Sequence, residues 1–264
     1  MNINMKKKVE AKYLDKEWDK MNVHLSGFLE SGDQEELHKF RVQVKKLHAM
    51  LSLFEIASRQ HGLVAGFKPV KKIFKAAGNI REAYTNLQLG ARFNFKNDAF
   101  EAWQRRIMEE GTKVFTDSGK HFLKQVKDTR KAIKRHLRPI DDSLISEFYK
   151  MQLEQIANEL MVPQFTESMH SNRKKIKTLL YNHKLADNVL TPSLFFNNVY
   201  MDTLQDSIGE WHDNIVIAEM LASPELNDKP LIAKIKRQNV KVKHKIIKLA
   251  DNFWKKATTL ETAV

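Results

Sequence analysis

One basic, histidine-bearing pattern occurs twice in this 264-residue chain, and the repetition limits the folds open to it. The first copy is "HKFRVQVKKLH", which begins at His38, and the second is "HSNRKKIKTLLY", which begins at His170. Three polar positions match at one constant offset: His38 with His170, Arg41 with Arg173, and Lys45 with Lys177. The core positions Leu37, Val44 and Leu47 match Met169, Ile176 and Leu179 at the same offset.

A second pair of segments follows in the same order. "AAGNIREAY" corresponds to "DSIGEWHDN" at nearly the same offset, which pairs Gly78 with Gly209 and Glu82 with Asp213. Two ordered matches at nearly one offset predict two related halves. We interpret the two glycines as positions of close helix packing, because no glycine-rich phosphate loop surrounds them.

Both halves have the composition and periodicity of helices. The chain has only 9 Gly and 6 Pro, too few for the many turns of an all-β fold. We predict an all-α fold of two bundles of about four helices each, with residues 1–139 and 140–264 as the halves and Arg138–Ser143 as the connection. The expected helices are residues 6–30, 34–58, 70–89, 97–138 with a break near "TDSGK", 142–161, 165–185, 193–222 and 230–257.

The first copy separates into two faces when it is wound as a helix. At about 100° per residue, the apolar residues lie on one face and His38, Arg41, Lys45 and His48 form a stripe about 80° wide on an adjacent face. The apolar face consists of Leu37, Phe40, Val44, Leu47, Leu51 and Phe54. In the second copy His170, Arg173 and Lys177 share a stripe, with Lys174 beside it.

Stripes of this composition are compatible with several kinds of site. The absence of cysteine excludes disulfides, iron–sulfur clusters, Cys-ligated zinc and a Cys nucleophile. A histidine metal site is disfavoured because the neighbouring residues on the stripe are cations, which repel a metal ion. Acid–base catalysis by a histidine lacks a marked nucleophile or carboxylate partner, so we expect no catalytic residue, no metal and no cofactor.

Anion binding is the remaining chemistry, against the alternative of an ordinary solvated basic face. Arginine offers a bidentate fork, lysine a mobile charge and histidine one or two N–H donors, and all three suit phosphate oxygens. A net charge of +13 indicates an anionic partner. Further cations extend the basic surface, and we assign Lys72, Lys124 and Lys131 to it together with Lys46 of the first copy.

"LHKFRVQVKKLHAML" and "MHSNRKKIKTLLY", each followed by a Gly-x-x-x-Glu/Asp helix, resemble the conserved histidine α-helical domain, CHAD. The resemblance covers nearly the whole chain and implies a single CHAD domain over residues 1–264, built as two four-helix bundles with pseudo-two-fold symmetry. It implies binding of inorganic polyphosphate by the basic residues around the histidine-bearing helices, and association with polyphosphate granules.

The family's basic motif falls on His38, Arg41, Lys45 and Lys46, and on His170, Arg173 and Lys177. The second copy departs from the family pattern, because it has Thr178 and Leu180 where the first has Lys46 and His48. No Glu-x-Glu-x-Lys strand of a fused triphosphate-tunnel domain occurs, which favours a stand-alone member.

The leading hypothesis is therefore a non-enzymatic polyphosphate-binding protein that holds its ligand in a basic groove between the two stripes and also accepts sulfate or phosphate ions. One alternative is a nucleic-acid-binding helical protein, and another is a polyphosphate-processing enzyme that uses His38 or His170. The N-terminal segment lacks the apolar region of a signal peptide, and no apolar run is long enough to span a membrane. We expect a cytoplasmic protein without a membrane partner.

Overall fold

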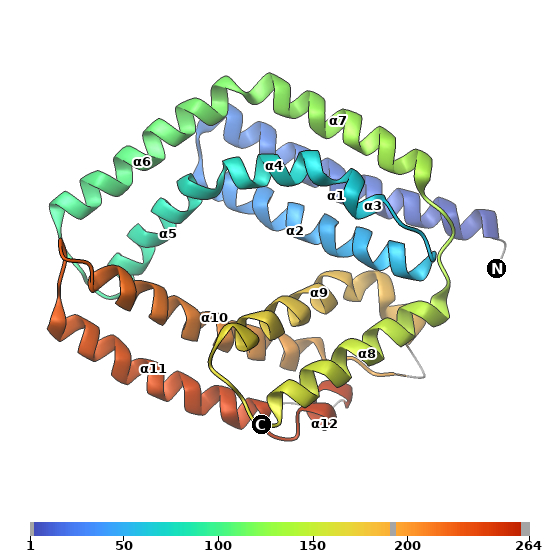
Figure 1. The fold of residues 1–264 in the computed structure, drawn as a ribbon. Helices are drawn as coiled ribbons and strands as arrows, with labels where there is room; N and C mark the ends of the chain where they lie inside the picture. The colour runs from blue at the N-terminus through green and yellow to red at the C-terminus, as the bar shows by residue number, and fades with distance from the viewer. Residues whose placement is uncertain (1–2, 191–193, 260–264) are drawn as a thin grey trace. The chain divides into compact units, whose positions relative to one another are not determined.

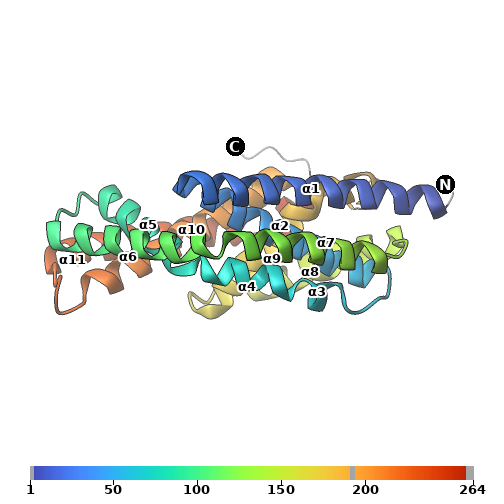
Figure 2. The same cartoon turned by 90° about the horizontal axis from the view of Figure 1, so that it is seen from above.

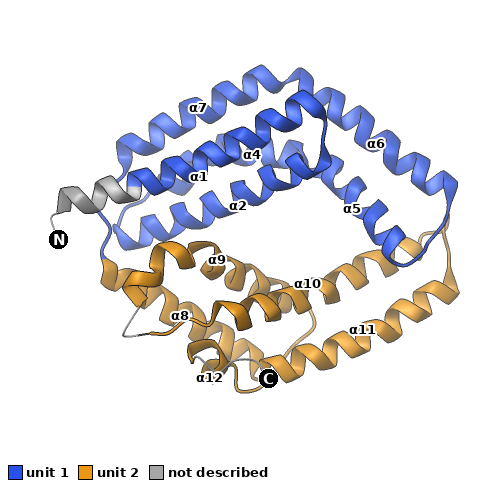
Figure 3. Ribbon diagram, turned by 180° about the vertical axis from the view of Figure 1, so that it is seen from behind, with its two compact units in different colours: residues 1–141 blue, residues 142–264 orange. Residues whose placement is uncertain are grey.

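The computed structural model describes residues 3–190 and 194–259, and side chains from residue 11 onward. All regular structure in these residues is helical, which confirms the predicted all-α class. The helices form two compact units, unit 1 from Met1 to Asp141 and unit 2 from Asp142 to Val264 (Figure 3). Each unit is described by itself.

Unit 1 contains a closed set of four helices and a helical hairpin (Figure 1). α1 packs on α2, α2 on α4, α4 on α7, and α7 on α1, while α5 and α6 form the hairpin. Figures 1 and 2 show α1 and α7 running alongside one another. The helices are α1 (Ile3–Ser31), α2 (Gln34–Ala57), α3 (Leu63–Gly66), α4 (Lys68–Ala76), α5 (Gly78–Arg92), α6 (Asp98–Asp117) and α7 (Gly119–His136).

Unit 2 follows a similar plan, in which the single helix α10 stands where unit 1 has α4 and α5. α8 packs on α9 and α9 on α10, and α10 and α11 form the hairpin, but the short α12 takes the place that α7 has in unit 1 by packing on α8 and α10. The helices are α8 (Asp142–Leu160), α9 (Glu167–Leu190), α10 (Asn198–Leu221), α11 (Lys229–Ala250) and α12 (Phe253–Thr258). The symmetric pair of bundles that the resemblance implies stays a prediction.

Two predicted helices are interrupted. Residues 70–89 do not form one helix, because α4 ends at Ala76 and α5 begins at Gly78. Residues 230–257 are divided by Asn252, whose φ of +51° lies in the left-handed region. The predicted break near "TDSGK" is confirmed, since α6 ends at Asp117 and α7 begins at Gly119. The predicted start of the 193–222 helix lies partly outside the described residues, and α10 begins at Asn198.

The apolar stripe of α2 lies in the core of unit 1 as predicted. Leu37, Phe40, Leu47 and Leu51 have no exposed surface. Phe28 and Leu25 of α1 are also fully buried. Burial of such side chains contributes about 1.5–3 kcal/mol each, so this stripe fixes which face of α2 is left for polar residues.

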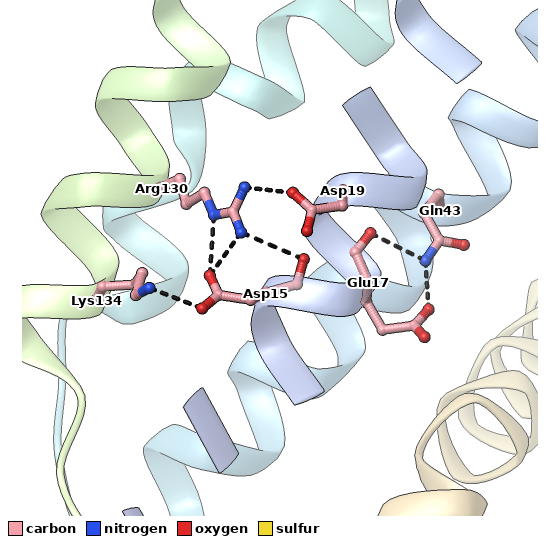
Figure 4. A network of polar contacts seen from close by, with 6 residues as sticks. All are labelled: Asp15, Glu17, Asp19, Gln43, Arg130 and Lys134. Carbon is pink, nitrogen blue, oxygen red and sulfur yellow. Dashed lines mark hydrogen bonds and ion pairs between the residues drawn. The ribbon is translucent and has the colours of Figure 1, made fainter. Parts of the chain in front are cut away.

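The polar contacts between α1, α2 and α7 fasten unit 1 together (Figure 4). Arg130 of α7 donates from Nη2 to Asp15 Oδ1 at 2.7 Å and from Nη1 to Asp19 Oδ1 at 2.5 Å. Lys134 donates to Asp15 Oδ2 at 2.7 Å. On the other side of α1, Gln43 donates to the buried Glu17.

Candidate functional site

α2 presents its polar stripe toward α4 and α5. His38, Arg41 and His48 are half-buried and Lys45 is exposed, so the stripe lies at the edge of the core rather than inside it. The residues that face it come from the stretch between Lys71 and Arg81. The site is therefore built from three helices of unit 1 rather than from α2 alone.

Phe74 of α4 organises two of the predicted cations. Arg41 Nη1 donates to the Phe74 carbonyl oxygen at 2.5 Å, and its guanidinium carbon lies 3.9 Å from the centroid of the Phe74 ring. Lys45 Nζ lies 5.8 Å from the same centroid. The ring attracts both cations through its negative face and holds them on one side of α2.

Arg81 of α5 is a half-buried cation that the sequence did not lead us to predict as a site residue. Its guanidinium carbon lies 4.9 Å from the Tyr84 ring centroid, and its Nη1 is buried with no hydrogen-bond partner among the described residues. Burial lowers the pKa of Arg41, and the charge of Arg81 lowers it further. Burial also lowers the pKa of Arg81, while Tyr84 and Glu35 act in the opposite direction.

His48 completes this group of side chains. Lys71 Nζ lies 3.4 Å from His48 Nε2. Burial, and then the charge of Lys71, hold the pKa of His48 below its ordinary value, while Glu55 opposes them. The imidazole is accordingly neutral at pH 7. We call Arg41, Lys45, His48, Lys71 and Arg81 the arginine cluster.

Two residues of the first copy lie elsewhere. Burial is the largest single influence on the pKa of Glu17 of α1 and raises it. Hydrogen bonds from Lys20 and Gln43, together with the charge of Lys46, outweigh burial and lower this pKa. Lys46 is therefore on the α1 side of α2, away from the Arg41 stripe. His38 is half-buried and engaged with neighbouring groups.

The remaining predicted cations of unit 1 are exposed on neighbouring helices. Lys72 lies on α4, and Lys124 and Lys131 lie on α7, which packs against α4. Of the other cations on α7, Lys134 is bound to Asp15 (Figure 4) and serves the fold. The assignment of Lys72, Lys124 and Lys131 to one basic surface with the arginine cluster stays a prediction.

Unit 2 repeats the central contact of the site. Arg173 Nε donates to the Gln205 carbonyl oxygen at 3.0 Å, and Gln205 corresponds to Phe74 at the offset of the downstream repeat, which pairs Gly78 with Gly209. Lys177 Nζ donates to Gln205 Oε1 at 3.2 Å. The second stripe is thus fastened to α10 at the position where the first is fastened to α4.

The charges around this contact differ between the units. Gln205 Nε2 donates to Asp202 and Asp206 at 2.9 and 2.6 Å. At the offset of the downstream repeat, these acids stand where unit 1 has Lys71 and Lys75. Burial and Arg173 lower the pKa of Lys177, and the two acids oppose them. Unit 2 therefore carries less net positive charge at its site.

A pair of histidines lies beside these cations. The rings of His170 and His212 have centroids 4.8 Å apart, and His170 Nδ1 is buried with no hydrogen-bond partner among the described residues. Burial lowers the pKa of His170, followed by Lys174, His212 and Arg173, while Glu167 raises it. We call His170, Arg173, Lys174, Lys177 and His212 the histidine cluster.

His212 and Arg81 were both missed by the sequence analysis, although a signal for them exists. They occupy the same position of the downstream repeat, at the offset that pairs Gly78 with Gly209. Comparing the charges of the paired segments would have drawn attention to both. An analysis of the helix faces of α2 and α9 alone could not identify these two residues, because Arg81 lies on α5 and His212 lies on α10.

Gly209 and Gly78 have different surroundings despite their equivalent positions. A Cβ on Gly209 would lie 2.7 Å from Nη2 of Arg173, whereas a Cβ on Gly78 would meet nothing within 4 Å. Gly209 thus makes room for a guanidinium rather than for a helix, which corrects the predicted role of this glycine. For Gly78 the predicted close packing is wrong.

Both clusters are suited to binding anions rather than metals. The described residues contain no group of three or more His, Cys, Asp or Glu side chains that could hold a metal ion. No described helix is long and apolar enough to cross a membrane. The clusters instead gather N–H donors and positive charge, which bind phosphate or sulfate oxygens.

Comparison with known proteins gives one family and one fold. The family model described as "CHAD domain" matches residues 12–222. The crystal structure of the CHAD domain from the plant Ricinus communis is similar, with a TM-score of 0.62 and 15% sequence identity over 91% of this chain and 86% of that chain. No curated protein matches the chain.

Proposed function

This chain belongs to the CHAD family, and from that premise we propose that it binds inorganic polyphosphate at the arginine cluster of unit 1. The proposal describes a binding protein without catalytic activity. Lys72, Lys124 and Lys131 contribute further phosphate contacts along the ligand, and the histidine cluster of unit 2 provides a second, weaker site. Association with polyphosphate granules is the cellular setting that this binding implies.

The observation that carries the proposal is the pairing of Arg41 with Arg81. Both guanidinium groups are half-buried, the charge of Arg81 acts on Arg41, and Nη1 of Arg81 has no acceptor among the described residues. Holding like charges together out of water is costly unless an anion compensates them. A phosphate group supplies both the compensating charge and the acceptor oxygens.

A polymeric ligand fits better than a single phosphate ion. Cations from α2, α4, α5 and α7 contribute to the surface of unit 1, and Lys72, Lys124 and Lys131 are exposed on it. One phosphate would engage only the arginine cluster. A chain with a negative charge on each phosphate can engage the cluster and the exposed lysines at once, so affinity should increase with chain length.

The test compares two double variants with equal changes in charge. Arg41→Gln/Arg81→Gln removes the paired guanidiniums, and the control Arg105→Gln/Arg106→Gln removes two exposed arginines of α6 that pair with Glu101 and Glu110. Binding of medium-chain inorganic polyphosphate is measured by calorimetry at one fixed salt concentration. Because each charge-assisted hydrogen bond contributes about 1.5–3 kcal/mol, we expect the cluster variant to weaken binding by at least about tenfold.

Equal affinity losses in the two variants would contradict the proposal, because net charge alone would then explain binding. Thermal unfolding of both variants checks that they fold. If the glutamine variant does not fold, Arg41→Lys/Arg81→Lys replaces it, because it keeps the positive charge and removes the guanidinium forks. Incubating the pure protein with polyphosphate tests for catalysis. Chain shortening or phosphate release that a His38→Ala variant abolishes would replace binding with enzymatic processing.

A further inference from the structure

The two units differ at one position of their sites in a way that changes how they respond to pH. Unit 1 has Arg81 where unit 2 has His212. An arginine is protonated at every physiological pH, whereas a histidine changes its charge between about pH 5 and pH 8. The same position is thus permanently cationic in one unit and titratable in the other.

His212 of α10 lies against a second histidine, His170 of α9. Their ring centroids are 4.8 Å apart, and both side chains are half-buried. Nδ1 of His170 is buried without a hydrogen-bond partner among the described residues. Two imidazoles at this distance repel each other when both are protonated, so a bound anion is required to stabilise the doubly charged pair.

The groups around the pair decide the direction of this effect. On α9, Lys174 and Arg173 disfavour protonation of His170 and Glu167 favours it. From α8 comes Glu159, whose carboxylate binds Lys175 at 2.5 Å and accepts from Ser168 at 3.3 Å. On α10, Glu210 and Asp213 flank His212 in the sequence and have their own interactions, and Glu210 accepts from Gln238 of α11 at 3.4 Å.

α11 adds a further cation near this end of the site. Lys243 Nζ lies 5.0 Å from the Phe165 ring centroid, and the Phe165 ring lies 5.7 Å from that of Trp211, the neighbour of His212. In the free protein, burial and the nearby cations keep the pKa of His170 below its ordinary value. His170 is therefore mostly uncharged at neutral pH and can gain charge when an anion binds.

We propose that His170 and His212 together form a proton-dependent site for the phosphate groups of a polyphosphate chain, so that unit 2 reaches its full binding strength only as the pH falls. The inference rests on the polyphosphate binding proposed above. It assigns different roles to the two units, because Arg41 and Arg81 stay charged at all physiological pH values, whereas His170 and His212 bind with the uptake of protons.

Linkage fixes the sign of the pH dependence. A bound polyanion stabilises the imidazolium form and raises the histidine pKa, so protons are taken up on binding and affinity increases as the pH decreases. Each pKa unit of this increase corresponds to a change of about tenfold in affinity between the protonated and neutral forms. The acids Asp202 and Asp206 beside Lys177 make unit 2 a weak site until the histidines are charged.

The experiment isolates unit 2 in the full-length chain. In the Arg41→Gln/Arg81→Gln background, binding of medium-chain polyphosphate is measured at pH 7.5 and pH 5.5 at matched ionic strength. The test variant adds His170→Gln/His212→Gln, which keeps polar side chains but removes the titration. The control adds His61→Gln/His244→Gln, two exposed histidines, one from each unit.

We expect binding in the background and in the control to be about tenfold tighter at pH 5.5 than at pH 7.5, and the gain to fall below about twofold in the test variant. An unchanged gain in the test variant would overturn the inference, as would a background protein that binds at neither pH. Polyphosphate that fails to bind the wild-type protein at either pH would instead overturn the proposed function.

A second readout does not depend on the stability of the variants. The ring C–H signals of His170 and His212 in the wild-type protein report their pKa values with and without polyphosphate. An increase of both pKa values on binding supports the inference. Values that stay constant while polyphosphate is bound would contradict it.

Discussion

Gly209 positions a cation by having no side chain. The guanidinium of Arg173 occupies the space where a Cβ would lie, 2.7 Å from Nη2, and from there its Nε reaches the Gln205 carbonyl oxygen. The equivalent Arg41 is held instead by the carbonyl and the ring of Phe74. The same spacing in the sequence therefore relies on different neighbours in the two units.

A Gly209→Ala variant should displace Arg173 without unfolding the protein. The guanidinium is the flexible end of a long side chain and can move, and the helix gains about 0.5–1 kcal/mol from alanine. That gain offsets a lost hydrogen bond of about 1 kcal/mol, so stability should change by less than about 1 kcal/mol. The Nε–H signal of Arg173 in an NMR spectrum should shift.

Gly78→Ala is the matched control, because its Cβ meets nothing within 4 Å. It should leave the Arg41 side-chain signal in place. An Arg173 signal that is unchanged in Gly209→Ala would show that this glycine does not position the arginine.

At the scale of helices, local residues decide where the predicted elements break. The α11–α12 stretch has helical periodicity throughout, yet α11 ends at Ala250, Asp251 is extended, and Asn252 adopts φ +51° and ψ +36° before α12 begins. Asparagine tolerates this left-handed conformation better than most residues. Periodicity over residues 230–257 could not reveal the break, because it depends on how Phe253 and Ala257 are buried beside α8 and α10.

Asn252→Val should destabilise the protein by about 1–2 kcal/mol, since a β-branched residue is strained at this φ. Asn252→Gly should remain within about 0.5 kcal/mol of wild type. Chemical denaturation monitored by circular dichroism measures both. Lys245→Val, at an exposed position inside α11, controls for helix propensity and should cost about 0.5 kcal/mol. Equal losses for the two valine variants would contradict a strained position.

Charge holds α7 to α1, and this attachment should weaken in acid. Hydrogen bonds from Lys134 and Arg130 lower the pKa of Asp15, although burial is the largest single influence and raises it. The stabilisation is fully present above the ordinary carboxyl pKa of about 3.9 and is lost as the pH falls through the lower folded value.

Asp15→Asn should therefore be less stable than wild type at pH 7, by about 0.5–1 kcal/mol for a partly exposed ion pair. The two proteins should converge in stability as the pH falls below about 4. Urea unfolding across this pH range measures the difference. A difference that is as large at pH 3 as at pH 7 would assign the effect to packing of the aspartate rather than to its charge.

At the scale of the molecule, the internal repeat predicted more of the site than composition did. It brought His38, Arg41 and Lys45 into correspondence with the second copy, and the arginine contacts to Phe74 and Gln205 recur at the repeat offset. It did not predict that unit 2 has the acids Asp202 and Asp206 at the positions where unit 1 has Lys71 and Lys75. The repeat was recognised from residues that the two copies share, so positions of opposite charge were not compared. The predicted groove between the two stripes remains a prediction.

The burial of individual aromatic side chains was harder to predict from the sequence. All four tryptophans suit packing anchors by residue type, but only Trp18 and Trp211 are buried, at 1% and 3% exposure, while Trp103 is 60% exposed. Residue type alone does not predict which helix faces are covered by another helix. α7 covers α1 and α4 in unit 1, and the six-residue α12 takes the corresponding place in unit 2.

The net charge of +13 predicts binding that is sensitive to salt for any polyanion, so selectivity must come from the clusters. The aromatic rings beside the arginine cluster, those of Phe74 and Tyr84, lie against the guanidiniums of Arg41 and Arg81, which leaves them less available for stacking with bases. We expect inorganic polyphosphate to displace single-stranded DNA at matched salt and equal phosphate concentration, measured by fluorescence anisotropy. DNA that resists displacement would favour the nucleic-acid alternative.

The most direct test of the central claim is to locate bound polyphosphate on the protein by NMR of the arginine side chains. Medium-chain polyphosphate is added to the wild-type chain while the Nε–H signals are recorded. We expect the signals of Arg41 and Arg81 to shift and saturate together, with little change at Arg105 and Arg106 of α6. Saturable binding that leaves Arg41 and Arg81 unchanged would contradict the assignment of the polyphosphate site to the arginine cluster.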